Sequence, residues 1–158
     1  MPLSRFDRAD DSPGFLLWQL TNLWQQSMRA ALVPLGITHV QFVLLASVAW
    51  LERSQVLVTQ AVLSRNAHTD VMMTSQVVRT LEEKGLLTRS VHPTDTRARL
   101  VSLTEDGRNV TRRAFTVVEG ADEQFFRELG DEGSTLVSLM QVLIGAQMNT
   151  KERPMNQI

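Results

Sequence analysis

The sequence predicts a mainly α-helical fold with one small β-hairpin. Apolar residues recur at helical spacing over most of the 158 residues. Ser, Thr or Asp residues stand where the helical segments would begin, as helix caps do. One stretch, 86–103, instead holds two β-prone runs joined by turn-forming residues. The length and the 43% share of hydrophobic residues fit a single domain, 1–158, with one core.

The first two helices are predicted from their caps. Ser12 precedes Pro13, which has no amide hydrogen to lose, so a helix is expected from 13 to about 32. The segment VPLGI ends it. Thr38 and Gln41 have the spacing of a capping box, which predicts a second helix reaching about Leu51.

Two short helices are expected next, in close succession. One begins near Thr59 in VTQAVLSRN, and the other near Thr69 or Asp70 in TDVMMTSQVVRTLEEKG, where Gly85 provides a left-handed cap. Two short helices joined by a tight turn are typical of a helix-turn-helix. The second, 70–84, would be its recognition helix.

The predicted recognition helix has two faces. Residues Met73, Val77 and Leu81 follow a core spacing. Another face carries Met72, Ser75, Gln76 and Arg79, whose amide, hydroxyl and guanidinium groups can hydrogen-bond bases or phosphates. Any surface helix has a polar face, so this face alone does not separate a DNA reader from a solvated helix.

The β-prone runs LLTRSV and RARLVSL, joined by HPTDT, predict a hairpin directly after the recognition helix. Such a hairpin is a wing, expected over 88–101. Its tip carries Arg97, with Arg99 close behind and Arg89 on the opposing strand. Arginine on a narrow loop can enter a minor groove, where negative potential is concentrated. Asp95 would hold either Arg97 or the loop backbone in place.

The chain ends in two further predicted helices. Thr104, followed by Glu105 and Asp106, starts a long helix, LGDEGS interrupts it, and a last apolar helix follows. Apolar stripes at both chain ends, 13–33 and 105–149, require a partner surface, which favours a homodimer built around a DNA-binding lobe at 38–104. The alternative is that these helices pack only on each other.

Composition excludes several classes of site. The chain has no Cys, so disulfides, thiolate metal sites and thiol chemistry are excluded. No apolar run approaches about 20 residues and the N-terminus is charged, which predicts a cytoplasmic protein outside the membrane. The net charge is −1, but nine basic and six acidic residues within 55–115 leave +3 around the hairpin. The local surplus permits a nucleic-acid partner.

The segments TSQVVRTLEEKGLLTR and DTRARLVSLTEDGR resemble the recognition helix and the wing of the MarR (multiple antibiotic resistance) family of winged helix-turn-helix regulators. The resemblance implies an intertwined homodimer that reads a pseudo-palindromic operator in double-stranded DNA. It also implies regulation by a small aromatic or phenolic ligand between the DNA lobe and the dimer helices, and most often repression. The family often has Arg where this chain has Gln76. The predicted DNA contacts are Thr74, Ser75, Gln76, Arg79, Arg89, Asp95, Arg97 and Arg99.

Four residues are candidates for an aromatic ligand pocket, Trp18, Trp24 and Trp50 with His39 as a polar handle, but packing in the core is the favoured explanation for each of them. No metal-ligand spacing, cofactor motif or catalytic constellation is present, so an enzyme is not expected. Two other hypotheses are a winged-helix module that binds protein and a ligand-binding dimer without DNA function. The basic wing argues against both.

Overall fold

The computed structural model describes residues 4–95 and 97–151, the side chains of 149–151 excepted. Thr96, inside the predicted wing, lies outside the described residues. The chain divides into two compact units, residues up to Asp122 and residues from Glu123 onward. Among the described residues, no single helix has both the length and the apolar composition of a membrane span; 13–35 and 39–53 reach them only together, across a 77° bend.

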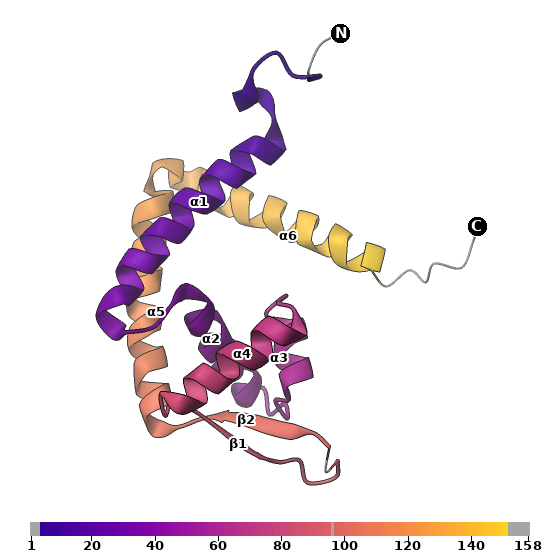
Figure 1. Cartoon of the computed structure of the whole chain (residues 1–158). Helices are drawn as coiled ribbons and strands as arrows, with labels where there is room; N and C mark the ends of the chain where they lie inside the picture. Colours follow the sequence, from indigo (N-terminus) through magenta and orange to yellow (C-terminus); the bar gives the residue numbers. More distant parts are fainter. Residues whose placement is uncertain (1–3, 96, 152–158) are drawn as a thin grey trace, which may run out of the picture. The chain divides into compact units, whose positions relative to one another are not determined.

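The first unit begins with a short 3-10 turn, η1 (Ala9–Asp11), and two helices whose predicted caps are confirmed (Figure 1). Helix α1 (Pro13–Leu32) starts at Ser12, whose Oγ accepts a hydrogen bond from the Phe15 amide at 3.4 Å. After η2 (Val33–Leu35), helix α2 (His39–Arg53) begins with the Thr38–Gln41 capping box. Both hydrogen bonds of the box are formed, at 3.3 and 3.2 Å.

Helices α3 (Gln60–Asn66) and α4 (Val71–Glu83) form the predicted helix-turn-helix. Thr59 caps α3 through the amide of Val62 at 3.2 Å, and Asp70 caps α4 through the amide of Met73 at 2.8 Å. The chain leaves α4 through Gly85 at φ +70°, the left-handed conformation in which glycine carries no steric penalty.

Strands β1 (Leu87–Val91) and β2 (Arg99–Leu103) form the predicted antiparallel hairpin, with Leu87 opposite Leu103 and Val91 opposite Arg99. The hairpin is also bonded to the segment before α3. The Val101 amide donates to the Val58 carbonyl at 2.8 Å, and Thr59 pairs with Leu100. The base of the hairpin is therefore part of the lobe, and its tip projects beyond it (Figure 1).

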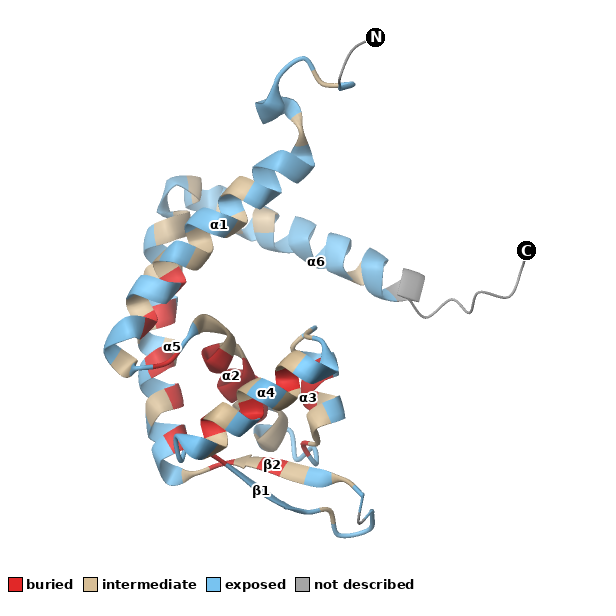
Figure 2. Ribbon diagram, viewed as in Figure 1, coloured by how far each residue is buried: buried red, intermediate tan, exposed pale blue. Residues whose placement is uncertain are grey.

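The core of the first unit lies between α2, α4, the hairpin base and the first half of α5 (Glu105–Phe126), as the buried positions in Figure 2 show. One predicted detail is wrong. In α4 the buried side chains are Thr74, Val78 and Leu81, whereas Met73 and Val77 are only half-buried. Its innermost line runs one residue later than a count of apolar residues indicates, because Thr74 satisfies its hydroxyl internally and can be buried.

The predicted interruption of the last long helical stretch is confirmed. The segment η3 (Arg127–Glu132) follows α5 and contains Gly130 at φ +48°, ψ −126°, a non-helical conformation. Helix α6 (Gly133–Lys151) follows. None of its described side chains is buried, although the helix is rich in Leu, Val, Met and Ile. A helix of this composition normally packs against another surface.

Candidate nucleic-acid interface

The outer face of α4 carries the predicted base-reading side chains. Gln76 and Arg79 are exposed, and Ser75 is half-buried. Met72, on the same face by its helical spacing, is 84% exposed, although sequence reasoning did not include it among the contacts. An exposed thioether beside amide and guanidinium groups adds an apolar contact of the kind that a thymine methyl accepts.

Thr74 does not belong to this face, contrary to the sequence-based prediction. Its side chain is 0% exposed, and its Oγ1 donates to the Asp70 carbonyl at 2.8 Å. The same oxygen lies 2.7 Å from Thr69 Oγ1, and Ser64 Oγ donates to the Thr69 carbonyl at 2.6 Å. Thr74 therefore holds the turn between α3 and α4 and has no surface to offer DNA.

The hairpin tip is ordered by Asp95. Its carboxylate accepts a hydrogen bond from the Arg97 amide at 3.0 Å, and its carbonyl accepts from the Ala98 amide at 3.0 Å. His92 Nδ1 in turn accepts from the Asp95 amide at 3.1 Å. Of the two roles expected for Asp95, the structure shows the second, because Asp95 holds the loop backbone. Among the described residues no carboxylate pairs with Arg97 or Arg99, and both are exposed.

Arg89 lies in a different environment from the tip arginines. Its Nε donates to Glu82 Oε2 at 2.8 Å, and its Nη2 bonds to the same oxygen. The hydrogen bond from Arg89 lowers the pKa of Glu82, and the same contact raises the pKa of Arg89. The sequence did not reveal this pair, although a glutamate in the last helical turn followed seven residues later by an arginine on the next strand is a usable signal.

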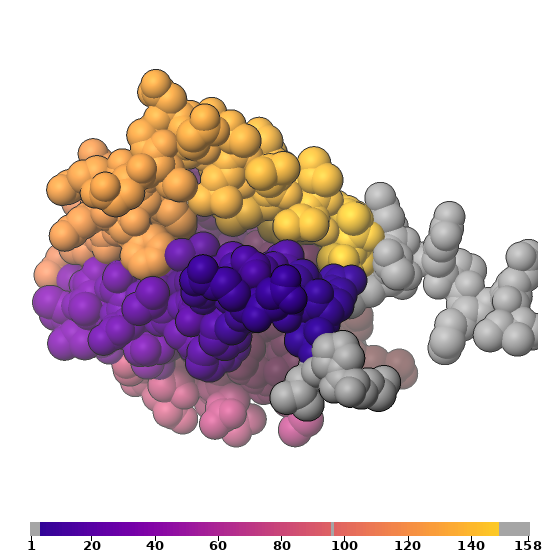
Figure 3. All heavy atoms as spheres, turned by 90° about the horizontal axis from the view of Figure 1, so that it is seen from above, coloured from indigo at the N-terminus to yellow at the C-terminus, as the bar shows by residue number. Residues whose placement is uncertain are grey.

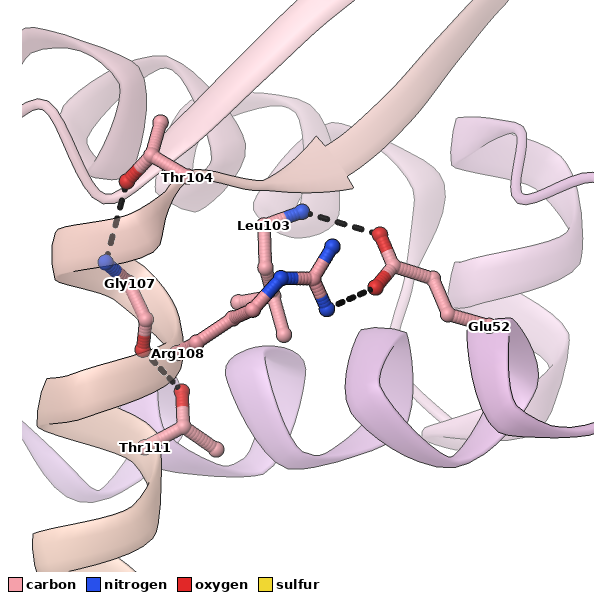
Figure 4. A network of polar contacts seen from close by, with 6 residues as sticks. All are labelled: Glu52, Leu103, Thr104, Gly107, Arg108 and Thr111. Atoms are coloured by element: carbon pink, nitrogen blue, oxygen red, sulfur yellow. Dashed lines mark hydrogen bonds and ion pairs between the residues drawn. The ribbon is translucent and has the colours of Figure 1, made fainter.

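A second network joins the hairpin base to α2 and α5 (Figure 4). Glu52 accepts hydrogen bonds from the Leu103 amide at 3.0 Å and from Arg108 Nη1 at 2.6 Å. Thr104 Oγ1, the predicted cap of α5, accepts from the Gly107 amide at 2.9 Å. One carboxylate therefore ties three elements together at the point where the hairpin ends.

Beside this network lies an open hollow of about 630 Å³ between α2 and α5. Three arginines and one glutamate give its rim a net positive charge, and Phe115 contributes an aromatic ring. Arg108 is paired with Glu52, whereas Arg53 and Arg112 have no carboxylate within ion-pair distance in the described part of the chain. The lining residues are Ala49, Glu52, Arg53, Leu103, Arg108, Thr111, Arg112 and Phe115.

The four predicted ligand residues do not form one pocket. Trp24 and His39 are in contact, with ring centroids 4.9 Å apart, and Trp24 Nε1 donates to Asp122 at 2.7 Å. Trp18 is 64% exposed and stacks on Phe15. Trp50 is 55% exposed and lies edge-on to Phe115, with Arg53 over its ring. Neither Trp18 nor Trp50 is a core residue of the single chain.

Comparisons with known proteins agree with this arrangement. The MarR family model matches residues 37–98. YdcH, an uncharacterized HTH-type transcriptional regulator of Bacillus subtilis, is 43% identical over 89% of this chain and 95% of its own length. An HTH-type transcriptional repressor of Mycobacterium bovis is 34% identical over 77% of this chain and 85% of its own.

Solved structures give the same result. A mutant of MarR from E. coli in complex with operator DNA has a TM-score of 0.74 and 26% identity, covering 82% of this chain and 91% of that one. The extent of the match to the Bacillus relative decides the assignment, since it spans almost the whole of both proteins. The chain belongs to the MarR family of winged helix-turn-helix transcription regulators, as its recognition-helix and wing segments predicted.

Proposed function

We propose that the chain is a dimeric, ligand-responsive repressor that reads a pseudo-palindromic operator and acts by binding, without enzymatic activity. Helix α4 enters the major groove and the hairpin tip enters the adjacent minor groove. The observation that carries this proposal is the pairing of an exposed polar face on α4 with an exposed Arg97, on a tip whose backbone Asp95 orders. The operator complex of the E. coli relative supports it.

The proposed dimer is supported by apolar side chains that the single chain leaves open to solvent. Figure 3 shows the side chains of α1, coloured indigo to purple, exposed on the viewed face. Covering such surfaces is the usual role of a subunit interface in proteins of this size. The exposed large apolar residues of the two helices are Phe15, Leu16, Leu17, Trp18, Leu20 and Leu23 on α1, and Val137, Leu139, Met140, Val142, Leu143, Ile144 and Met148 on α6.

Repression is supported by the Mycobacterium relative, which is named a repressor. Because the curated relatives are bacterial, the DNA that such a protein reads lies in the cytoplasm, which is the location we propose. The exposed hairpin arginines without a carboxylate partner among the residues described, Arg97 and Arg99, argue against the alternative that the winged helix binds protein. Such guanidinium groups are well suited to contacts with DNA phosphates.

The test of DNA reading is selection of bound fragments from random duplexes, followed by titration of the best site at two salt concentrations. A palindromic site with half-sites about one helical turn apart and a steep salt dependence is expected. Absence of any enriched sequence, with the protein folded and dimeric, contradicts the proposal.

Two substitutions separate the roles of helix and tip. Arg97→Ala is expected to weaken binding to all sequences and to reduce the salt slope by about 1 per subunit, about 2 for the dimer, whereas Gln76→Ala is expected to change the preferred sequence. Two substitutions outside α4 and the hairpin serve as controls. Arg113→Ala on α5 removes a guanidinium, and Gln26→Ala on α1 removes a side-chain amide. Control variants that behave like Arg97→Ala and Gln76→Ala would show that the faces are misassigned.

We further propose that the hollow between α2 and α5 takes the ligand, an aromatic carboxylate. The free charges of Arg53 and Arg112 suit a carboxylate, and Phe115 suits an aromatic ring. The Glu52 network lies in the wall of the same hollow and holds the end of β2. A bound carboxylate therefore competes with Glu52 for Arg108 and alters the support of the hairpin.

Benzoate and its neutral analogue benzamide test this site. Because Trp50 packs on Phe115, ligand entry is expected to change tryptophan fluorescence. Arg112→Gln should weaken benzoate binding about tenfold, the value of one charge-assisted hydrogen bond. Arg113→Gln, one position away and outside the hollow, should leave it unchanged. Equal binding of benzoate and benzamide, or equal effects of the two variants, would rule out this location.

A further inference from the structure

The Glu82–Arg89 ion pair connects the recognition helix to the hairpin. Glu82 lies in the last turn of α4, and Arg89 is the central residue of β1. Two of the three guanidinium nitrogens of Arg89, Nε and Nη2, bond to one oxygen of Glu82, and each side chain keeps about a third of its surface exposed, 31% for Arg89 and 33% for Glu82. Within the described parts of the chain it is the only ion pair between α4 and the hairpin.

The Glu82–Arg89 pair lies at the position along the hairpin where buried residues give way to exposed ones. Arg89 is opposite Val101 in the strand register, and Val101 is buried, as are Leu87 and Leu103 two residues nearer the base. Two residues nearer the tip, Val91 and Arg99 are both exposed. Apolar packing therefore holds the hairpin up to the Arg89–Val101 pair, and at that same position the Glu82 carboxylate adds the ion pair with α4.

We infer that Glu82 is a positioning residue for DNA reading, which acts through Arg89 to fix the angle between recognition helix and hairpin. The inference rests on the proposed function, in which α4 and the hairpin tip occupy neighbouring grooves of one site. A specific complex requires both elements in register at once, so a preorganised angle lowers the ordering cost of that complex. Binding to arbitrary DNA depends chiefly on phosphate contacts and gains little from the angle.

Arg89 is then a structural partner of Glu82 and not one of the DNA contacts that the sequence predicts. A guanidinium neutralised by Glu82 contributes little to counterion release on DNA binding. Loss of either partner is then expected to weaken operator binding by up to about fivefold, the range of an exposed ion pair, with the salt slope unchanged. If a DNA phosphate instead replaces Glu82 on Arg89, Glu82→Gln strengthens binding to all sequences and Arg89→Gln lowers the salt slope by about 1 per subunit, about 2 for the dimer.

The experiment compares Glu82→Gln, Arg89→Gln and the charge swap Glu82→Arg with Arg89→Glu in the full-length chain. Glu83→Gln makes the same charge change on the neighbouring residue, which is exposed and has no ion-pair partner among the described residues. Affinity for the selected operator and for a scrambled duplex is measured at two salt concentrations. We expect both single variants to lose operator affinity, the swap to recover it, and Glu83→Gln to match the wild type.

Failure to recover with the swap overturns the inference, because a glutamate at position 89 rescues an ion pair but repels a phosphate. So does an equal effect of Glu82→Gln and Glu83→Gln.

Hydrogen exchange of the β1 and β2 amides without DNA gives a readout that is independent of the proposed function. Exchange in the hairpin is expected to accelerate several-fold in Glu82→Gln and Arg89→Gln but not in Glu83→Gln. Unchanged exchange in both pair variants overturns the inference even if the protein reads DNA. The third outcome is faster hairpin exchange in both pair variants together with a wild-type protein that enriches no DNA sequence. It would show that the Glu82–Arg89 pair does hold the hairpin, but that the proposed function, and with it the role of the pair in DNA reading, is wrong.

Discussion

Gln41 and Thr111 are buried polar residues whose side-chain hydrogen bonds are completed by other residues of the fold. Gln41 is buried because its side-chain oxygen accepts both from the Thr38 amide and from Lys84 Nζ, at 3.2 and 3.1 Å. Thr111 is buried because its hydroxyl donates to the Gly107 carbonyl at 2.6 Å. A satisfied hydroxyl or amide loses the desolvation penalty that otherwise keeps it at the surface.

His39 makes the stability of the fold depend on pH. Burial against Trp24 lowers its pKa from the ordinary histidine value of 6.5, with Arg29 acting in the same direction and Asp122 opposing both. Above the unfolded pKa the ring is neutral in both states and adds no pH dependence. As the pH falls below 6.5 the unfolded chain takes up the proton first, so the free energy of unfolding decreases until the folded pKa is passed.

The expected outcome is that His39→Gln loses this decrease, measured as urea unfolding between pH 8 and pH 5. Asp122→Asn should enlarge it, because the carboxylate that raises the pKa of His39 is gone. His68→Asn replaces an exposed histidine in a left-handed conformation that Asn tolerates, and should retain the wild-type profile. An unchanged profile in His39→Gln would locate the pH dependence elsewhere.

At the scale of elements, the first turn of α5 packs directly on the segment between α4 and β1. Gly107 is buried there, and a Cβ at this position would lie 2.0 Å from the Leu86 carbonyl oxygen. Leu86 in turn follows the left-handed Gly85 that ends α4. The recognition helix, the hairpin and α5 therefore meet at one point where only the absence of a side chain permits close approach.

Gly107→Ala is expected to destabilise the protein by about 3 kcal/mol, because the backbone of Leu86 cannot move aside as a flexible side chain would. Gly120→Ala, in the same helix, adds its methyl to open space and is expected to stabilise by about 0.5 to 1 kcal/mol through the loss of glycine's freedom in the unfolded chain. Urea unfolding at equal protein concentration measures both. Similar stabilities for the two variants would contradict the packing described for α5.

At the scale of the whole molecule, each end of the chain presents an apolar helix surface that the single chain does not bury. Helix α1 exposes six large apolar side chains between residues 15 and 23, and α6 has no buried residue among those described. Surfaces of this extent in a protein that also carries a charged DNA-reading lobe are expected to be covered by a second copy.

Leu139→Glu combined with Leu143→Glu is therefore expected to raise the dimer dissociation constant by at least about 100-fold, since two charges would have to be buried in an apolar contact. Sedimentation velocity over a concentration series measures the change, and operator affinity should fall with it. Gln141→Glu adds one charge to the same helix at a polar position and serves as the control. A double variant that remains dimeric at the same concentrations would show that α6 lies outside the interface.

The helix starts, the hairpin and the family membership could all be predicted from the sequence. Caps, turns and the order of elements depend on residues close together in the chain, such as Thr38 with Gln41 or Asp70 with Met73. The exposure of Gln76 and Arg79 on one face of α4, the face proposed to read DNA, also followed from local spacing, because helical periodicity sets which side chains share a face.

Which polar groups form hydrogen bonds inside the protein could be seen only in the folded chain. Thr74 is buried, Arg89 is taken by Glu82, and Glu52 joins β2 to α5 across 51 and 56 residues of sequence. The predicted aromatic pocket separated into a Trp24–His39 contact and an exposed Trp50 beside a different hollow. The physical reason is that hydrogen bonding and burial depend on neighbours in space, and residues far apart in sequence become neighbours only once the helices have packed.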